Sequence, residues 1–447
     1  MGQLLLIALR SLLQHRRRNI FLGSAIAAVT ALLVILLGLS TGIQSTMLEA
    51  ATTLSSGHVN VAGFYKVTDN NPAPLVTDYK KVRAIVERET PGLDYVIDRG
   101  RGWAKVISDT GSFQAGVNGV DIAQEKGLTV VLKLAEQRAY KEGGEPKILG
   151  DFASLAQPNT ILLFVDQAKR LEVDVGDKVT LSAPTWRGVN NTVDVTVGAV
   201  AQNVGFMSAW SVFVPQQVVR DIYRMNEDTT GAIQIYLKDP KDIPAVEDHL
   251  RKVLADEGYL LMEHLAQPFW MKFDIVRRED WTGQKIDITN WRDEISFMSW
   301  TIDALDTLTV LLVAILMGLI MVGIMNTLWI AIRERTREIG TMRAIGMQKG
   351  RVLWMFLMEA GALGFLSTVT GALGGALVAW AINTSGVSVP IEAFQIFTMS
   401  DTLWLEVEAY AVIRAILIIT VLTTLSALYP AWRAMKLRPV SAMHHVG

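Results

Sequence analysis

The chain has 447 residues, of which 50% are hydrophobic and 19% charged, and its mean hydropathy is +0.30. This composition excludes an ordinary soluble domain and favours a protein with both membrane-spanning and water-exposed parts. The formal net charge of -2 implies no strongly basic surface of the kind that binds nucleic acid, and the absence of cysteine excludes disulfides and thiolate metal sites.

Several segments are apolar and long enough to cross a bilayer, which takes about 20 residues. We predict transmembrane helices at residues 19–48, 307–332, 353–383 and 404–429. The first is too long for the apolar core of a signal peptide, so we expect it to remain uncleaved. The predicted fold class is a membrane protein with four transmembrane α-helices and a large α+β extracytoplasmic domain between helices 1 and 2.

Lysine and arginine are unevenly distributed between the segments that connect these helices. Residues 333–352 contain six of them, the tails at 1–18 and 430–447 are also basic, and residues 384–403 contain none. Because basic residues are retained on the cytoplasmic side of a membrane, we place both tails and the charged loop in the cytoplasm. Residues 384–403 then form a short extracytoplasmic loop.

The large extracytoplasmic domain is predicted to cover residues 49–286. Its sequence mixes alternating, strand-like stretches such as "GHVNVAGFYK" with helical ones such as "DYKKVRAIVERETPG". This mixture predicts an α+β domain, and we expect two subdomains.

A stalk helix is predicted at residues 287–306. Apolar residues recur there at three- and four-residue spacing, namely Trp291, Ile295, Met298, Ile302 and Leu305. This is the period of one helix face. We therefore expect a rigid helix that continues into the second transmembrane segment.

The third transmembrane segment contains Gly371 and Gly375 in a G-x-x-x-G pattern. Glycines at this spacing permit another helix to approach closely. Glycine is also common in membrane helices for other reasons, so the pattern leaves open whether the close approach involves a second copy of the chain.

No motif for enzymatic chemistry is found. The sequence lacks the phosphate-binding G-x-x-x-x-G-K-[ST] loop, the zinc-binding H-E-x-x-H pair and the G-x-S-x-G nucleophile turn. The pair His444–His445 near the end of the chain is more often inert than metal-binding. We therefore predict no catalytic residue and no metal site.

The stretch "IRERTREIGTMRAIGMQKGR", residues 332–351, combines six basic residues with two glutamates between two apolar segments. Glu334 and Arg337 are three residues apart, a spacing that supports a helix. A narrow apolar stripe is formed by Ile339, Met342 and Ile345. Gly346 is a plausible C-terminal stop. We predict a short amphipathic helix that rests on lipid headgroups or grips a cytoplasmic protein.

Residues 325–360, "MNTLWIAIRERTREIGTMRAIGMQKGRVLWMFLMEA", resemble the hallmark region of MacB/FtsX-type ABC transporter permeases. The segments "YPAWRAMKLRPVSAM" (429–443) and "FVDQAKRLEVDVGDKVTL" (164–181) are similar to other parts of that family. The layout of one span, an exported domain and three further spans also agrees. Since this sequence contains no ATPase motif, we expect no fused ATPase, and the chain resembles the stand-alone permeases, including the lipoprotein-releasing and cell-division types.

The resemblance implies that the amphipathic helix is a coupling helix received by a separate ABC ATPase. The residues that it assigns to this contact are Glu334, Arg337, Glu338, Ile339, Gly340, Met342, Arg343 and Gly346. ATP and Mg²⁺ would bind to the ATPase, and no cofactor to this chain. The permease would work as a dimer, with a second copy or a paralogue, in the bacterial inner membrane.

The family mechanism implied is mechanotransmission, in which ATP-driven movement of the coupling helices reaches the exported domain. The expected cargo is a lipoprotein or another amphiphile, with a periplasmic acceptor left open. Alternatives are peptide or drug efflux, regulation of a cell-wall hydrolase and, less favoured, a membrane receptor. An ABC ATPase encoded beside this chain would separate the transporter from the receptor.

Overall fold

The computed structural model describes residues 10, 14, 16–66, 72–185, 188–387 and 402–436, with the side chains of residues 18, 298, 299 and 301 left out. The chain forms two compact units. The helical unit contains the described residues up to 45 and from 302 onward, and the exported domain contains the described residues of 46–301.

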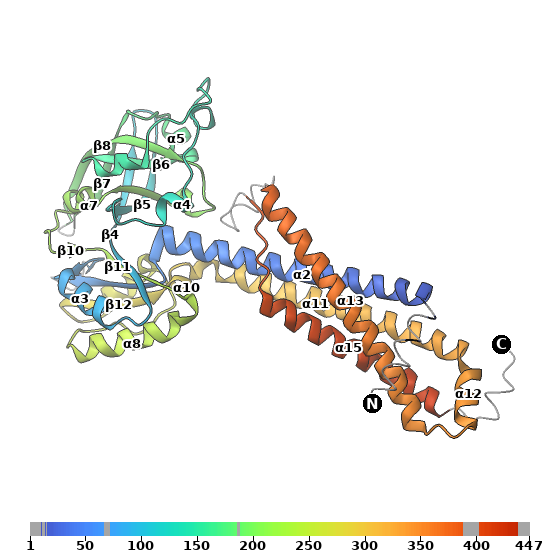
Figure 1. Cartoon of the computed structure of the whole chain (residues 1–447). Helices are drawn as coiled ribbons and strands as arrows, with labels where there is room; N and C mark the ends of the chain where they lie inside the picture. Colours follow the sequence, from blue (N-terminus) through green and yellow to red (C-terminus); the bar gives the residue numbers. More distant parts are fainter. Residues whose placement is uncertain are drawn as a thin grey trace. The chain divides into compact units, whose positions relative to one another are not determined.

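The predicted transmembrane helices are present and are longer than predicted (Figure 1). They are α2 (Arg16–Ala51), α11 (Ser299–Glu334), α13 (Lys349–Ser385) and α15 (Ala409–Met435). Along α11 and α15 many large apolar side chains are exposed. Exposed apolar faces of this length are expected where the solvent is lipid.

The last transmembrane helix differs from its predicted bounds of 404–429. Its start is later because the backbone N–H of Leu405 donates to Asn383 Oδ1, and Asn383 Nδ2 donates to the carbonyl of Leu405, both at 2.9 Å. This pairing holds residue 405 outside the helix. Its end is later because the helix continues through Pro430, which membrane helices tolerate better than soluble ones.

The G-x-x-x-G pattern of α13 is covered by α2 of the same chain. A Cβ atom at Gly371 would overlap the carbonyl oxygen of Ala27, and one at Gly375 would lie 2.8 Å from the carbonyl oxygen of Ala31. The two helices therefore approach with backbone against backbone. This face of α13 therefore packs against α2 of the same chain and does not contact a second copy.

The exported domain contains the predicted mixture of helices and strands. One part is an antiparallel sheet in which β1 (Val59–Lys66) lies between β12 (Gly283–Asn290) and β11 (Ala232–Leu237). The first half of β4 (Leu93–Ile107) pairs with β11 and extends this sheet. The helices α3 (Tyr79–Glu89) and α8 (Ile243–Asp256) pack against each other beside it.

The second part of the exported domain is a closed barrel that begins with the other half of β4. The barrel order is β4, β5 (Ser112–Val120), β9 (Ser211–Pro215), β6 (Thr160–Phe164), β8 (Asn190–Ala201) and β7 (Lys178–Pro184). The barrel closes because β7 pairs back with β4, with Ser182 opposite Lys105. Its interior is filled by buried valine, leucine, isoleucine and alanine. The two parts correspond to the two predicted subdomains (Figure 1).

The remaining elements are short. The strands are β2 (Pro72–Ala73), β3 (Val76–Thr77) and β10 (Thr229–Thr230). The helices are η1 (Thr52–Ser56), α4 (Leu128–Val131), η2 (Gln137–Ala139), η3 (Phe152–Ala156), α5 (Val165–Leu171), α6 (Met207–Trp210), α7 (Gln216–Tyr223), η4 (Pro240–Asp242), η5 (Phe269–Met271) and α9 (Phe273–Arg278).

The prediction of one continuous stalk helix over 287–306 is wrong. Residues up to Asn290 belong to β12, and they are followed by α10 (Trp291–Glu294), η6 (Ser296–Met298) and only then α11. The side-chain oxygen of Asn290 accepts hydrogen bonds from the backbone N–H groups of Arg292 (2.9 Å) and Asp293 (3.3 Å). This N-cap starts a new helix and ends the strand.

The residues predicted to line the stalk therefore have different surroundings. Trp291 and Ile295 are buried in the exported domain, whereas Ile302 is buried and Leu305 half-buried on α11. The side chain of Met298 lies outside the described residues. The helix that leads into the second span begins at Ser299.

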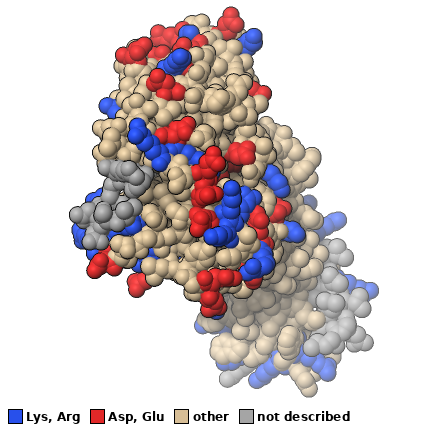
Figure 2. All heavy atoms as spheres, turned by 90° about the vertical axis from the view of Figure 1, so that its left-hand side faces the viewer, with Lys and Arg blue, Asp and Glu red and all other residues tan. Residues whose placement is uncertain are grey.

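On the face of the molecule in Figure 2, acidic and basic side chains are interspersed.

Candidate functional site

The charged loop folds as α12 (Thr336–Ala344), a helix of 9 residues between α11 and α13. Gly346 adopts φ of +107°, a left-handed conformation that ends the helix. The predicted helix and its predicted stop are thus both present.

The residues predicted for ATPase coupling divide into an outer and an inner face. Glu334, Arg337, Glu338 and Gly346 are exposed. Ile339 and Gly340 are buried, and Met342 and Arg343 are half-buried. The first group is accessible to a partner, Met342 and Arg343 are partly accessible, and Ile339 and Gly340 are covered.

The inner face of α12 packs on an apolar core at this end of the helical unit. The core contains Ile332, Ile339, Val352, Met355, Phe356, Ala431 and Ala434. Ile339 is 0% exposed, whereas Ile345 is 83% exposed. The predicted apolar stripe therefore does not face outward as a unit. Ile339 and Met342 hold α12 on its own chain, and Ile345 is the stripe residue that a partner can contact.

An ion pair that the sequence analysis missed attaches α12 to α13. Arg335, the residue before the helix, donates from Nη1 to both carboxylate oxygens of Glu359, at 3.3 and 3.1 Å. Their side chains are only 9% and 8% exposed. Removing one partner of a buried pair typically costs about 3–5 kcal/mol, because it leaves an uncompensated charge. The available signal was that Glu359 is the single acidic residue of α13.

Arg343 attaches α12 to the end of α15. Its Nη1 donates to the carbonyl oxygen of Met435 at 3.1 Å. That oxygen belongs to the last residue of α15, where helix carbonyls lack internal partners and cations are favoured. Arg343 is therefore engaged within the chain, which makes it a poor choice for the wall of an ATPase cleft.

The outer face of α12 has the chemistry of a protein-binding surface. It presents two carboxylates (Glu334 and Glu338), the guanidinium of Arg337 and, beyond the helix, the apolar side chain of Ile345. Mixed charges around an apolar residue suit a protein surface better than an anionic membrane, which would disfavour the glutamates.

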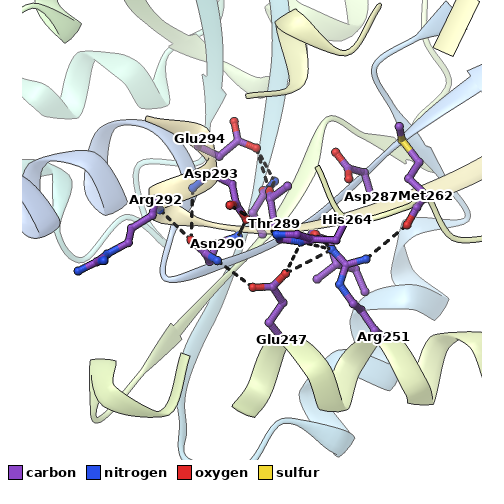
Figure 3. Close-up of polar contacts among 12 residues, drawn as sticks. Glu247, Arg251, Met262, His264, Asp287, Thr289, Asn290, Arg292, Asp293 and Glu294 are labelled. Carbon is purple, nitrogen blue, oxygen red and sulfur yellow. Dashed lines mark hydrogen bonds and ion pairs between the residues drawn. The ribbon is translucent and has the colours of Figure 1, made fainter. Parts of the chain in front are cut away.

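A second polar cluster lies in the exported domain, where Glu247, His264 and Asp293 place potential metal ligands within 4.8 Å of one another (Figure 3). His264 Nδ1 is 3.0 Å from Glu247, and its Nε2 is 3.7 Å from Asp293. Arg251 Nη2 lies 2.9 Å from the same Nδ1 and 3.3 Å from Glu247. This guanidinium occupies the position that a cation would need. Burial raises the pKa of Asp293, although the backbone N–H of Asn290 donates to it.

The cluster instead joins α8 to the segment that leads toward α11. Glu247 on α8 accepts a hydrogen bond from Asn290 Nδ2 at 2.8 Å, and Asn290 is the residue that caps α10 (Figure 3). We assign it a structural role.

Two family models match the chain. The model described as "FtsX-like permease C-terminal" matches residues 310–439, and "MacB-like periplasmic core domain" matches residues 22–253. The first covers α12 and most of the transmembrane helices around it. The second covers most of the exported domain.

The chain is also similar to individual proteins and to a solved structure. The lipoprotein-releasing system transmembrane protein LolC of Neisseria meningitidis is 23% identical over 324 residues, which cover 70% of this chain and 71% of LolC. The macrolide export ATP-binding/permease protein MacB of Syntrophobacter fumaroxidans is 31% identical over 138 residues, which cover 31% of this chain and 17% of MacB. The chain is similar to the solved structure of the periplasmic region of MacB from Actinobacillus actinomycetemcomitans. The match covers 56% of this chain and 95% of that structure, with 12% identity and a TM-score of 0.30.

Proposed function

We propose that this chain, which belongs to the family of MacB- and FtsX-like ABC transporter permeases, couples ATP hydrolysis by a separate ATPase to movement of its periplasmic domain. ATP and Mg²⁺ bind to the ATPase in this proposal, and this chain supplies no catalytic group. The permease acts in the bacterial inner membrane as a dimer with a second copy or a paralogue.

The observation that carries the proposal is the attachment of α12. Its inner face is fixed to α13 through Arg335 and Glu359 and to α15 through Arg343 and the Met435 carbonyl. Its outer face is exposed. A displacement applied to α12 from outside therefore acts on several transmembrane helices at once. This is the property that a coupling helix needs.

We propose a lipoprotein or another amphiphile as the cargo, which the permease extracts from the membrane or exports. LolC, the lipoprotein-releasing relative, aligns with 70% of this chain, whereas the MacB relatives of Syntrophobacter fumaroxidans and Bdellovibrio bacteriovorus align with 31% and 52% of it. The name of MacB states macrolide export, so efflux of a drug or peptide is the second candidate. Each cargo is released on the periplasmic side.

The experiment replaces exposed residues on the outer face of α12. Glu338→Lys and Ile345→Asp are each expected to release the ATPase from the detergent-solubilised complex while the permease stays inserted. Loss of a buried, hydrogen-bonded charge at an interface costs about 2–5 kcal/mol. Glu142→Lys, an exposed charge reversal in the exported domain, is the matched control and should retain the ATPase.

The opposite result would identify α12 as a lipid-resting helix. An added cation at position 338 would then strengthen its seat on anionic headgroups, and co-purification of the ATPase would not change. Retention of the ATPase at wild-type affinity by both Glu338→Lys and Ile345→Asp would overturn the proposal.

A further inference from the structure

The exported domain contains an open pocket with a cavity volume of about 120 Å³. The apolar lining comes from segments distant in the chain and includes Trp103, Phe206, Met207, Trp210, Trp270 and Phe297. Such a concentration of aromatic side chains around open space indicates a binding site for an apolar group.

The aromatic walls pack against one another. The ring of Phe297 lies 5.0 Å from that of Phe206 and 5.7 Å from that of Trp270, measured between centroids. Trp210 is 54% exposed. The walls are therefore braced, while part of the aromatic surface remains open to an incoming ligand. Met207 adds an adaptable side chain that accommodates ligands of variable shape.

The pocket also has a buried polar lining around Arg101, whose side chain is 4% exposed. Arg101 Nη2 donates to Asn60 Oδ1 at 2.9 Å, and its guanidinium lies 4.9 Å from the ring centroid of Phe269. Nη1 is 3.8 Å from Glu294 Oε1, which is too far for a hydrogen bond, and it has no hydrogen-bond partner among the described residues. A buried donor of this kind favours a ligand that supplies an oxygen acceptor.

The charge of this polar lining restricts the ligand further. Glu294 already lies within ion-pair distance of Arg101, and its Oε1 accepts a hydrogen bond from Thr289 at 2.9 Å. A ligand carboxylate would add an uncompensated negative charge to a buried site. A neutral carbonyl oxygen would accept from Arg101 without changing the charge balance.

We propose that this pocket binds a fatty acyl chain joined through an ester or amide carbonyl. The chain occupies the aromatic walls, and the carbonyl oxygen accepts a hydrogen bond from Arg101 Nη1. The inference rests on the proposed function, because it assigns the amphiphilic cargo a binding site in the exported domain.

The position of the pocket along the chain connects it to the transmembrane helices. Ser55, which lines the pocket, follows the last residue of α2 by four positions, and Phe297 precedes the first residue of α11 by two. Movement at the ends of these helices therefore acts directly on pocket walls. Binding and release of the acyl chain are coupled to α11, the helix that α12 follows in the chain.

The test uses the full chain in phospholipid nanodiscs and a monoacylglycerol with a diazirine in its acyl chain. Photo-crosslinked positions are mapped by mass spectrometry. We expect saturable labelling of peptides that contain residues 206–211 and 269–270. Labelling confined to the transmembrane helices would overturn the proposal.

Gly116→Leu is the variant that fills the pocket. Gly116 lines the pocket, and a Cβ atom there would have only the Trp210 carbonyl oxygen nearby, at 3.6 Å. Gln114→Leu adds the same side chain at an exposed site two residues earlier on β5 and is the matched control. Gly116→Leu should reduce labelling of the pocket at least tenfold. Trp210→Glu, which changes an exposed wall residue, should reduce it by the same factor. Gln114→Leu should leave the labelling unchanged. Undiminished labelling in a folded Gly116→Leu or Trp210→Glu protein would refute the site.

Competitors distinguish the source of the acyl chain and test the role of the carbonyl. Displacement of the probe by a lysophospholipid but not by an N-palmitoylated peptide identifies a membrane lipid as the ligand, and displacement by the peptide identifies a lipidated polypeptide. Free palmitate should compete at least tenfold more weakly than either ligand. Equal competition by palmitate would refute the assignment of a neutral carbonyl.

The acyl-site proposal can be wrong while the proposed function is right. If labelling of the pocket is absent while Glu338→Lys still releases the ATPase, the chain remains a coupled permease and the acyl site is wrong. If the ATPase never binds, the proposed function fails whether or not the pocket takes an acyl chain.

Discussion

Replacement of Glu359 by leucine is expected to release α12 from α13. The substitution leaves Arg335 buried at 9% exposure without its carboxylate partner, which typically costs about 3–5 kcal/mol. Because the loss concerns the attachment of one short helix, we expect it to appear as local opening. At about 1.4 kcal/mol per factor of ten, amide hydrogens of α12 should exchange roughly a hundred to several thousand times faster.

The assay is hydrogen exchange on the permease in nanodiscs, followed by mass spectrometry of the peptide that contains α12. The double variant Arg335→Met/Glu359→Leu removes both charges and should restore most of the protection, since an apolar pair can replace a buried ion pair with little loss. Glu338→Leu, at an exposed site on the same helix, is the control and should exchange like the wild type. If Glu359→Leu and the double variant exchange at the same rate as the wild type, the ion pair does not hold α12.

Three further outcomes are expected. Gly371→Leu should prevent α13 from packing on α2 and yield aggregated protein in size-exclusion chromatography, whereas Gly374→Leu, which has no neighbour within 4 Å, should elute normally. Leu305→Pro, inside α11, should abolish cargo release while ATP hydrolysis continues, because a proline in a helix interior costs about 3 kcal/mol or more. The control is Ser299→Pro at the first residue of the helix, which should still release cargo. If neither variant releases cargo, the loss has a cause other than the break in α11. A cysteine at Asn118 should react with an impermeant maleimide on cells whose outer membrane has been opened, and labelling only after complete lysis would contradict a periplasmic domain.

The sequence by itself predicted the four transmembrane helices and the large domain between the first two. These predictions used local properties of the chain, which can be read without the fold. They are the long apolar segments, the distribution of lysine and arginine, and the block at residues 325–360. The helix α12 and its stop at Gly346 were also predictable, because helix periodicity and a terminal glycine act over a few residues.

The stalk shows where local patterns failed. Apolar residues at helical spacing over residues 287–306 predicted one helix, but residues 287–290 are held in β12 by pairing with β1. Asn290 then caps a separate helix. A strand partner more than two hundred residues away in sequence overrides a helical period because the sheet supplies its hydrogen bonds and its buried surface together.

Only the tertiary structure decided which residues act together. It paired Arg335 with Glu359, covered Gly371 with α2 and buried Ile339 while leaving Ile345 exposed. It also brought together the pocket walls around Arg101 from segments far apart in the chain. Hydropathy and helical period depend on near neighbours along the chain, whereas burial, ion pairing and pocket lining depend on neighbours in space, which the fold alone specifies.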